Sequence, residues 1–162
     1  MFTFFALALP TPRTKISNAK FIVYILWAIG LAFSNLLIGF IIGLLLDLPI
    51  SNEYFVLGHL SNYFMTTVLT ILIGIPNAFF AVWQKGYLAP LGFVALTLVF
   101  SQIIAATGYG YYFPWSIPGL YSGAGGKYKL QLNELSYIIL VLTGLVGYFS
   151  TIIYWKYTDH VK

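Results

Sequence analysis

The chain has 162 residues, of which 60% are hydrophobic and only 7% are charged, with a formal net charge of +4. Soluble domains carry roughly 25% charged residues, so the composition predicts an integral membrane protein, and the four long apolar segments described below make the expected fold all-α. The absence of cysteine excludes disulfides and thiol chemistry, and His59 and His160 are too far apart to suggest a metal site. The positive charge is scattered over short segments, which argues against a nucleic-acid partner.

The first residues, "MFTFFALALP", form a short apolar run that is followed by Arg13, Lys15 and Lys20. A secretory signal peptide has its positive charges before the apolar run, so that alternative is disfavoured. We expect residues 1–19 to form a cytoplasmic interfacial segment instead, with its phenylalanines in the acyl boundary and its basic residues against anionic headgroups.

Four later segments are long and apolar enough to cross a bilayer core of about 30 Å, which requires roughly 20 residues per helix. The predicted transmembrane helices are residues 21–46, 60–83, 87–113 and 135–155. Pro76 lies deep in the second and should kink it, whereas Pro90 lies in the first turn of the third, where its missing N–H matters little.

The distribution of Lys and Arg predicts the orientation, because short loops rich in these residues stay in the cytoplasm. With both termini inside, six of the eight basic residues are cytoplasmic and only Lys127 and Lys129 lie outside. The six are Arg13, Lys15, Lys20, Lys85, Lys156 and Lys162. We therefore expect a multi-pass protein of the cell membrane with cytoplasmic termini.

The predicted spans contain no Asp, Glu, Lys or Arg. The intramembrane ionisable groups on which proton pumps and voltage sensors rely are thus missing, and so is any constellation for a membrane-embedded enzyme. The polar groups in the spans are hydroxyls and the amides of Asn35, Asn77 and Gln102. We expect these to form hydrogen bonds between helices, each contributing about 0.5–2 kcal/mol, with lining of a substrate pathway as the alternative.

The segment "GYGYYFPWSIPGLYSG" follows the third span and contains two prolines, Pro114 and Pro118, that make one straight helix improbable. Residues 114–134 are predicted to form an outer re-entrant segment and loop, with a short helix beginning near Pro114. Its end is expected at the glycines of "SGAGG", namely Gly123, Gly125 and Gly126. The alternative is a plain aromatic anchor at the membrane interface, for which Tyr109, Tyr111, Tyr112 and Trp115 are suited.

Two stretches carry a resemblance to a known family. The segment "YFPWSIPGLYS" (residues 112–122) resembles the hallmark of permease subunits of the ABC-2 type transporter family, in particular the branch found with bacitracin- and lantibiotic-resistance exporters. The stretch from Leu7 to Pro49, with its "LP-x-x-R-x-K" turn, its "AKF" and a long helix ending in "GLLL", is similar to the part of that family that leads into the third transmembrane helix.

The resemblance implies that the four spans correspond to helices three to six of a six-helix permease, so that the chain begins in the loop after the second helix as an N-terminally truncated form or a half-permease. It implies an exporter subunit without an active site or a cofactor of its own. Its partners would be a separate ATPase subunit and a second permease copy or half, in the lipid bilayer. The runner-up is a non-transporting scaffold or accessory subunit, or an inactive permease fragment.

The resemblance also assigns roles to two groups of residues. The candidates for contact with the ATPase are Phe4, Phe5, Leu7, Pro10, Pro12, Arg13 and Lys15. For Arg13 and Lys15, a role in topology alone is at least as well supported. The candidates for an outer gate of the pathway are Phe113, Pro114, Trp115, Pro118 and Tyr121.

Overall fold

The computed structural model describes residues 13–47, 53–84, 86–123 and 132–157, and every element within these ranges is helical. The α-helices are α2 (Arg13–Leu45), α3 (Glu53–Gly74), α4 (Pro76–Trp83), α5 (Leu88–Ala106), α6 (Ile117–Ser122) and α7 (Glu134–Tyr157), with two 3₁₀ turns, η1 (Gly110–Tyr112) and η2 (Pro114–Ser116). Four helical stretches in the described part are long and apolar enough to cross a membrane. The prediction of an all-α membrane protein is therefore confirmed.

The first long helix starts earlier than predicted. Residues 13–19, expected to belong to an interfacial segment, form the first turns of α2 and continue without a break into the apolar part of the helix. The sequence from Arg13 to Ile29 contains no proline or glycine, so no residue in it interrupts the backbone hydrogen bonds. The rest of the predicted interfacial segment, residues 1–12, lies outside the described residues.

The kink predicted at Pro76 is present. Helix α3 ends at Gly74 and α4 begins at Pro76, which has no N–H to continue the hydrogen-bond ladder. Small residues of α7 allow close approach at this break: a Cβ added to Gly147 would lie 2.6 Å from the Cα of Pro76, and one added to Gly144 would lie 3.2 Å from the carbonyl oxygen of Leu72. The missing side chains on α7 thus let the broken helix pack against it.

The third span is shorter than predicted, because α5 ends at Ala106 instead of continuing to Phe113. Gly108 has a φ of 85°, in the left-handed region that glycine adopts without strain, and this conformation ends the helix. The chain then turns through η1 and η2 before α6 begins.

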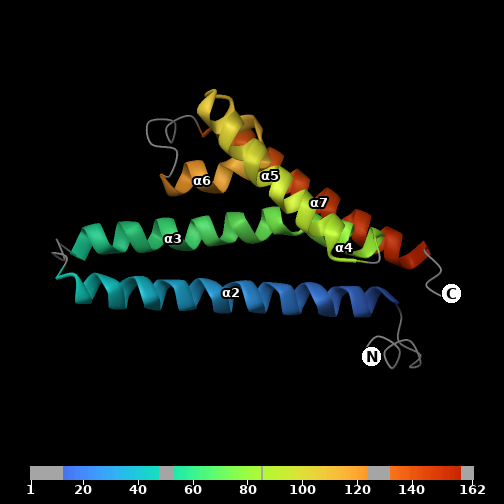
Figure 1. Cartoon of the computed structure of the whole chain (residues 1–162), viewed down its shortest axis with the longest axis horizontal. Coiled ribbons are helices and arrows are strands. Elements are labelled where there is room, and N and C mark those ends of the chain that lie inside the picture. Colours follow the sequence, from blue (N-terminus) through green and yellow to red (C-terminus); the bar gives the residue numbers. More distant parts are fainter. Residues whose placement is uncertain (1–12, 48–52, 85, 124–131, 158–162) are drawn as a thin grey trace.

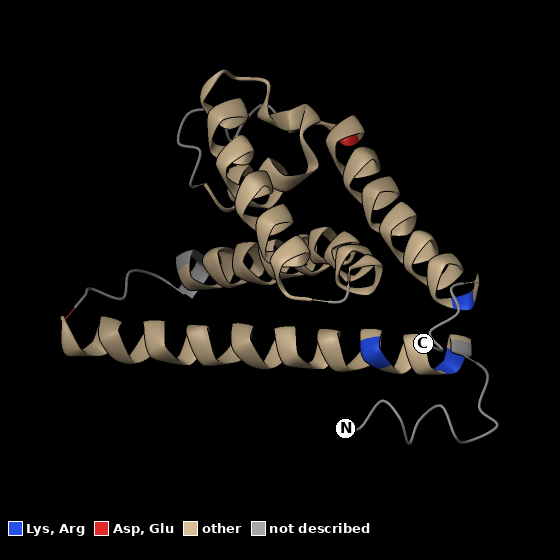
Figure 2. Cartoon of the chain, turned by 45° about the vertical axis from the view of Figure 1, so that its right-hand side comes forward, with Lys and Arg blue, Asp and Glu red and all other residues tan. Residues whose placement is uncertain are grey.

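The long helices form two groups that diverge. Helices α2 and α3 lie side by side and antiparallel, whereas α5 and α7 lean away from them toward the segment that contains η1, η2 and α6 (Figure 1). Figure 2 shows that α5 and α7 are also splayed from one another. Helix α4 contacts both at one end of the bundle, and the segment that contains η1, η2 and α6 contacts both α5 and α7 at the other.

The core of the described residues lies where α6 enters the space between α3 and α7. Ile117 is fully buried and Leu120 is 2% exposed, and Ile117 packs in one cluster with Leu69, Ile73 and Leu140. Helix α6 ends at Gly123, which has a φ of 91° and caps the helix, as predicted. Gly125 and Gly126 lie outside the described residues.

The side chains in the two halves of the aromatic segment differ in exposure, and each half fits one of the two interpretations drawn from the sequence. Tyr109 and Tyr112 are 63% and 52% exposed, as suits an interfacial anchor. Trp115 instead packs inward, with its ring 5.4 Å from the rings of both Phe93 and Phe113 and in contact with the core cluster. The second half of the segment is therefore a structural insert between the helices.

We predict that Gly147→Ala destabilises the protein by about 1–3 kcal/mol, because the added methyl group would overlap the backbone at Pro76. Gly39→Ala is the matched control: it has the same change in helix propensity, and no atom lies within 4 Å of the added Cβ. The measurement is the free energy of unfolding in detergent micelles. Equal stability of the two variants would contradict the packing described here.

Candidate functional site

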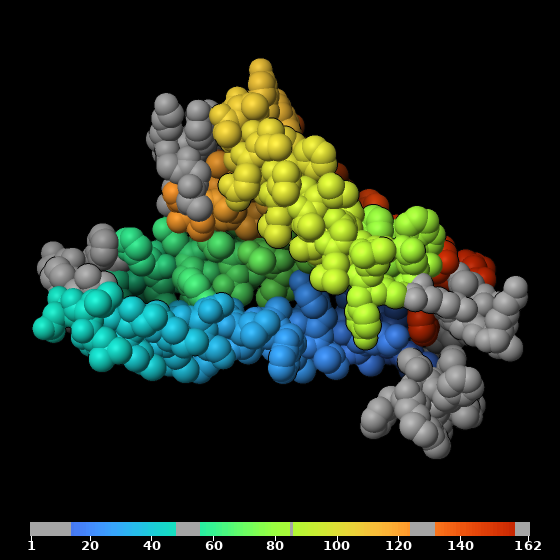
Figure 3. Space-filling model, viewed as in Figure 1, coloured from blue at the N-terminus to red at the C-terminus, as the bar shows by residue number. Residues whose placement is uncertain are grey.

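Two hollows open between the helices on either side of α3, and Thr70 lines both. The first is a groove of about 360 Å³ between α2 and α3, and the second is a cavity of about 280 Å³ between α3, α5 and α6. The space-filling view shows the seam along which α2 lies against α3 (Figure 3). Neutral polar groups gather in these hollows, and we call them together the polar surface: Asn35, Thr66, Thr67, Thr70, Ser101 and Gln102.

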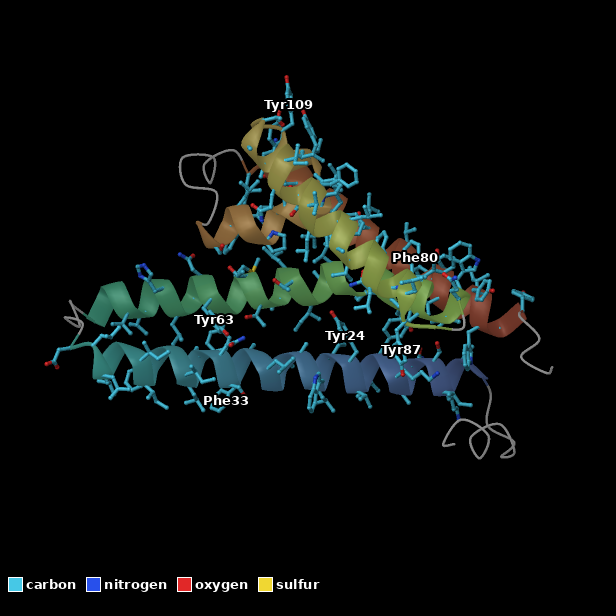
Figure 4. The ribbon with its side chains drawn as sticks, viewed as in Figure 1. Tyr24, Phe33, Tyr63, Phe80, Tyr87 and Tyr109 are labelled. Atoms are coloured by element: carbon cyan, nitrogen blue, oxygen red, sulfur yellow. The ribbon has the colours of Figure 1, made fainter. Side chains whose placement is uncertain are left out.

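Two tyrosines bridge the groove between α2 and α3. The hydroxyl of Tyr24 on α2 donates to the carbonyl oxygen of Ile71 at 3.0 Å, and the hydroxyl of Tyr63 on α3 donates to that of Ala32 at 2.6 Å. Figure 4 shows both rings in the space between the two helices. The Tyr24 hydroxyl lies directly over Gly74, so a Cβ at that position would displace the tyrosine from its present place. The helices are thus cross-linked without packing tightly.

The hydroxyls of the groove are already satisfied as donors. Thr66, Thr67 and Thr70 each donate to the carbonyl oxygen four residues earlier, at 2.7–2.9 Å. Each hydroxyl oxygen keeps acceptor capacity toward the groove. Asn35 is exposed beside them, with both a donor and an acceptor on its amide. The groove can therefore hydrogen-bond a neutral polar ligand, or water, but offers no charge.

The cavity beneath α6 has the same neutral character. Ser101 donates to the carbonyl oxygen of Leu98 at 2.8 Å, and Gln102 next to it is exposed. On the facing side the buried Ser116 lies near the carbonyl oxygens of Gly110 and Phe113, at 2.6 and 2.8 Å, and donates its single hydroxyl proton to one or shares it between them. Ser116 thereby fixes the turn that leads into α6.

The predicted gate residues come together in the structure. Pro114 begins η2, and Pro118 is buried in the first turn of α6. Trp115 and Tyr121 pack against the core cluster, and Phe113 lies against Trp115. Their packing fixes the shape of the insert.

The predicted ATPase-contact residues fall largely outside the described part of the chain. Phe4, Phe5, Leu7, Pro10 and Pro12 lie outside it, and Arg13 is the first residue of α2, with a side chain that is not described. Lys15 is exposed on the first turn of α2. Of the three amides, Asn35 and Gln102 are exposed, whereas Asn77 has a buried Oδ1 without a hydrogen-bond partner among the described residues.

The beginning of α2 is fastened to the end of α7. The rings of Phe21 and Tyr148 are 5.1 Å apart, and the Tyr148 hydroxyl donates to Oδ1 of Asn18 at 2.9 Å. The ammonium group of Lys20 lies 4.2 Å from the centre of the Trp155 ring. Elsewhere α2 is exposed: none of its most apolar 18-residue window is buried. Helix α2 is thus held at one end and by two tyrosine bridges.

The sequence-based analysis did not identify Tyr24, Tyr63 and Tyr148 as functional or structural links. A signal was available, because a tyrosine inside an otherwise apolar span needs a partner for its hydroxyl. The identity of that partner was not accessible, since the three hydroxyls bond to residues between 31 and 130 positions away in the sequence.

Residues 6–103 match the family model described as "ABC-2 family transporter protein". This region includes α2, α3, α4 and most of α5, and with them all six residues of the polar surface. No curated protein matches the chain, and no solved structure does.

We predict that Tyr24→Phe and Tyr63→Phe each lower the free energy of unfolding by about 1 kcal/mol, because each removes one interhelical hydrogen bond. Backbone hydrogen exchange in α2 should accelerate in both variants. Tyr87→Phe serves as the control, because Tyr87 is 86% exposed. Exchange in α2 that is unchanged in both variants would show that the bridges do not hold this helix.

Proposed function

The chain belongs to the ABC-2 family of transporter proteins and is a membrane permease component, and from this premise we propose that it forms part of the export pathway of an ATP-driven exporter whose ATPase is a separate subunit. We further propose that it serves in the branch associated with resistance to bacitracin and lantibiotics, and that its spans correspond to helices three to six of a six-helix permease. In this role it carries no catalytic residue and no cofactor.

The observation that carries the proposal is the exposure of amide and hydroxyl groups within apolar spans. Asn35, Thr70 and Gln102 are exposed on the polar surface. Hydrocarbon cannot satisfy such groups, and polar residues within membrane spans normally face a bundle interior or a water-filled cavity. The polar surface therefore supports a pathway that is lined by neutral hydrogen-bonding groups and carries amphipathic cargo.

The groove between α2 and α3 is not covered by the rest of the described residues, which supports the presence of a partner chain that covers it. We propose that this partner is a second permease copy or half, whose helices enclose the groove between α2 and α3. Enclosure would remove Asn35 and Thr70 from lipid and place them toward the pathway. The ATPase would bind at the end of the bundle where α2 begins.

The charge distribution supports this placement of the ATPase. Lys and Arg lie at the beginning of α2 and the end of α7, at the same end of the bundle, and Glu134 lies at the opposite end of α7 (Figure 2). Basic residues at membrane-helix ends favour the cytoplasmic side. We propose that both termini are cytoplasmic in the cell membrane, with residues 4–15 in contact with the ATPase.

Helix α2 is the element through which ATPase closure would reach the pathway. Its first turn contains two of the proposed contact residues, Arg13 and Lys15, and it borders the polar surface along the groove. Helix α2 has few contacts with α7 and α3, and these contacts are hydrogen bonds or aromatic contacts. Such contacts can be exchanged at a modest energetic cost, and we propose that α2 moves between two positions that the ATPase states favour differently.

The insert formed by η2 and α6 is proposed as the outer gate. It adjoins the cavity lined by Ser101 and Gln102, and its displacement would join that cavity to the outer side. Pro114 restricts the backbone at the start of η2 and Pro118 does so in the first turn of α6, which favours movement of the insert as one unit.

We predict that Gln102→Leu and Asn35→Leu lower the export rate about tenfold, the equivalent of about 1.4 kcal/mol in a rate-limiting barrier. The measurement is resistance of the producing cells to bacitracin and to a lantibiotic peptide, at matched levels of the chain in the membrane. Ile103→Leu, at an exposed apolar neighbour on α5, is the control. A chain that is only an accessory subunit would leave resistance unchanged in all three variants.

We predict that Trp115→Phe retains membrane insertion but reduces export, since it weakens the contact with Phe93 that positions the gate. Trp115→Ala should reduce export further, and Pro114→Ala should act in the same direction by loosening the start of η2. Export is compared with the amount of folded chain recovered in mild detergent. Normal export by all three variants would refute the gate.

A further inference from the structure

A third hollow, separate from the polar surface, lies at the end of the bundle that carries the basic residues. It has a volume of about 280 Å³ and opens between α2, α4, the first turn of α5 and the last turns of α7. Most of its lining is apolar, as at Phe21, Ala78 and Ala81. Gly74, Ala78 and Ala81 leave it open on the side of the broken helix, because they have little or no side chain.

The lining includes one cation, Lys20. Its ammonium group lies over the Trp155 ring at 4.2 Å from the ring centre, and this contact holds it at the rim. The carboxylates that the structure describes, Asp47 and Glu134, follow the end of α2 and begin α7, at the opposite end of the bundle. Within the described residues, Lys20 therefore faces no carboxylate.

The hollow also contains an acceptor that lacks a donor. Oδ1 of Asn77 is buried and has no hydrogen-bond partner among the described residues. The hydroxyls of Tyr24 and Thr151, which line the same hollow, already donate to the backbone. A buried amide oxygen without a donor is costly, so a bound group that carries a hydroxyl would be stabilised there.

Lys20 on α2 and Asn77 on α4 both line the hollow. Tyr24 follows Lys20 by one turn of α2, and its hydroxyl lies over Gly74. Asn77 follows Gly74 by three residues, at the beginning of α4. One ligand headgroup can therefore meet both residues while an apolar tail lies along the remaining lining.

We propose that this hollow binds phosphatidylglycerol from the adjacent leaflet, with its phosphate at Lys20, a headgroup hydroxyl at Oδ1 of Asn77 and an acyl chain against the apolar lining. The cation, the amide oxygen and the apolar lining would each bind one part of this lipid. Basic pockets between membrane helices are established sites for anionic headgroups. The proposal does not depend on whether the chain is an exporter.

The test uses the full chain in nanodiscs that contain equal fractions of phosphatidylglycerol, phosphatidic acid and phosphatidylcholine, with the retained lipid identified by native mass spectrometry. Phosphatidic acid carries the phosphate but lacks the headgroup hydroxyl. We expect the unmodified chain to retain phosphatidylglycerol about tenfold over phosphatidylcholine, because the phosphatidylcholine headgroup has a cation that Lys20 repels and no hydroxyl for Asn77. Equal retention of phosphatidylglycerol and phosphatidylcholine would overturn the proposal.

Three variants separate the contribution of Lys20 to lipid retention from that of Asn77. Lys20→Gln should lower retention of both anionic lipids about tenfold, and Asn77→Leu should lower phosphatidylglycerol to the level of phosphatidic acid without changing the latter. Lys156→Gln is the control, since Lys156 also lies over an aromatic ring, that of Tyr157, but does not line the hollow. A loss with Lys156→Gln equal to that with Lys20→Gln would indicate general attraction to basic residues and would refute the site.

Thermal unfolding of each variant accompanies the binding measurement. If Lys20→Gln unfolds, Lys20→Arg provides the comparison, because it retains the charge and should retain both anionic lipids. Equal loss of both lipids in a folded Asn77→Leu variant would assign Asn77 to packing and overturn its role in the site.

Discussion

The close contact between Pro76 and Gly147 is the constraint on which the arrangement of the other helices depends. Pro76 breaks the second span, and the absence of a side chain at Gly147 lets the broken helix approach α7. Helix α4 thereby follows α7, whereas α3 runs beside α2. The divergence of α3 from α7 creates the space that Ile117 and its neighbours fill.

That divergence also accounts for the two hollows of the polar surface. With α6 inserted on one side of α3 and two tyrosine bridges on the other, α3 is supported without being enclosed. Thr70 therefore remains exposed to both hollows. In a bilayer the remaining acceptor capacity of Thr70 and the exposed amides of Asn35 and Gln102 are better met by water, cargo or another chain than by lipid, which fits a permease component.

The sequence was sufficient for features that one residue determines by itself. The break at Pro76 and the cap at Gly123 follow from the backbone restrictions of proline and glycine, and both were predicted. The end of α5 was predicted seven residues too late, because apolar aromatics continue past the turn at Gly108 and hydropathy cannot detect it. The start of α2 was missed for the opposite reason: its first turns are polar but helical.

The contacts between helices could not be predicted from the sequence. The spans are apolar around their whole circumference, so no apolar stripe indicates which face meets a neighbour. The contact of Tyr24 with Gly74 and that of Lys20 with Trp155 depend on which helices lie together and at what height. The amides of Asn35 and Gln102 were recognised as candidates, but their exposure depends on the same arrangement.

The central claim is that this chain works as the membrane part of an ATP-driven exporter. The most direct test is to tag the chain, extract it from native membranes in mild detergent, and identify the proteins that copurify with it by mass spectrometry, together with the intact mass of the tagged chain. The account predicts an ATP-binding-cassette ATPase in the purified complex, in proportion to the chain. Recovery of the folded chain without any such ATPase, at every detergent concentration that keeps other membrane complexes intact, would contradict it.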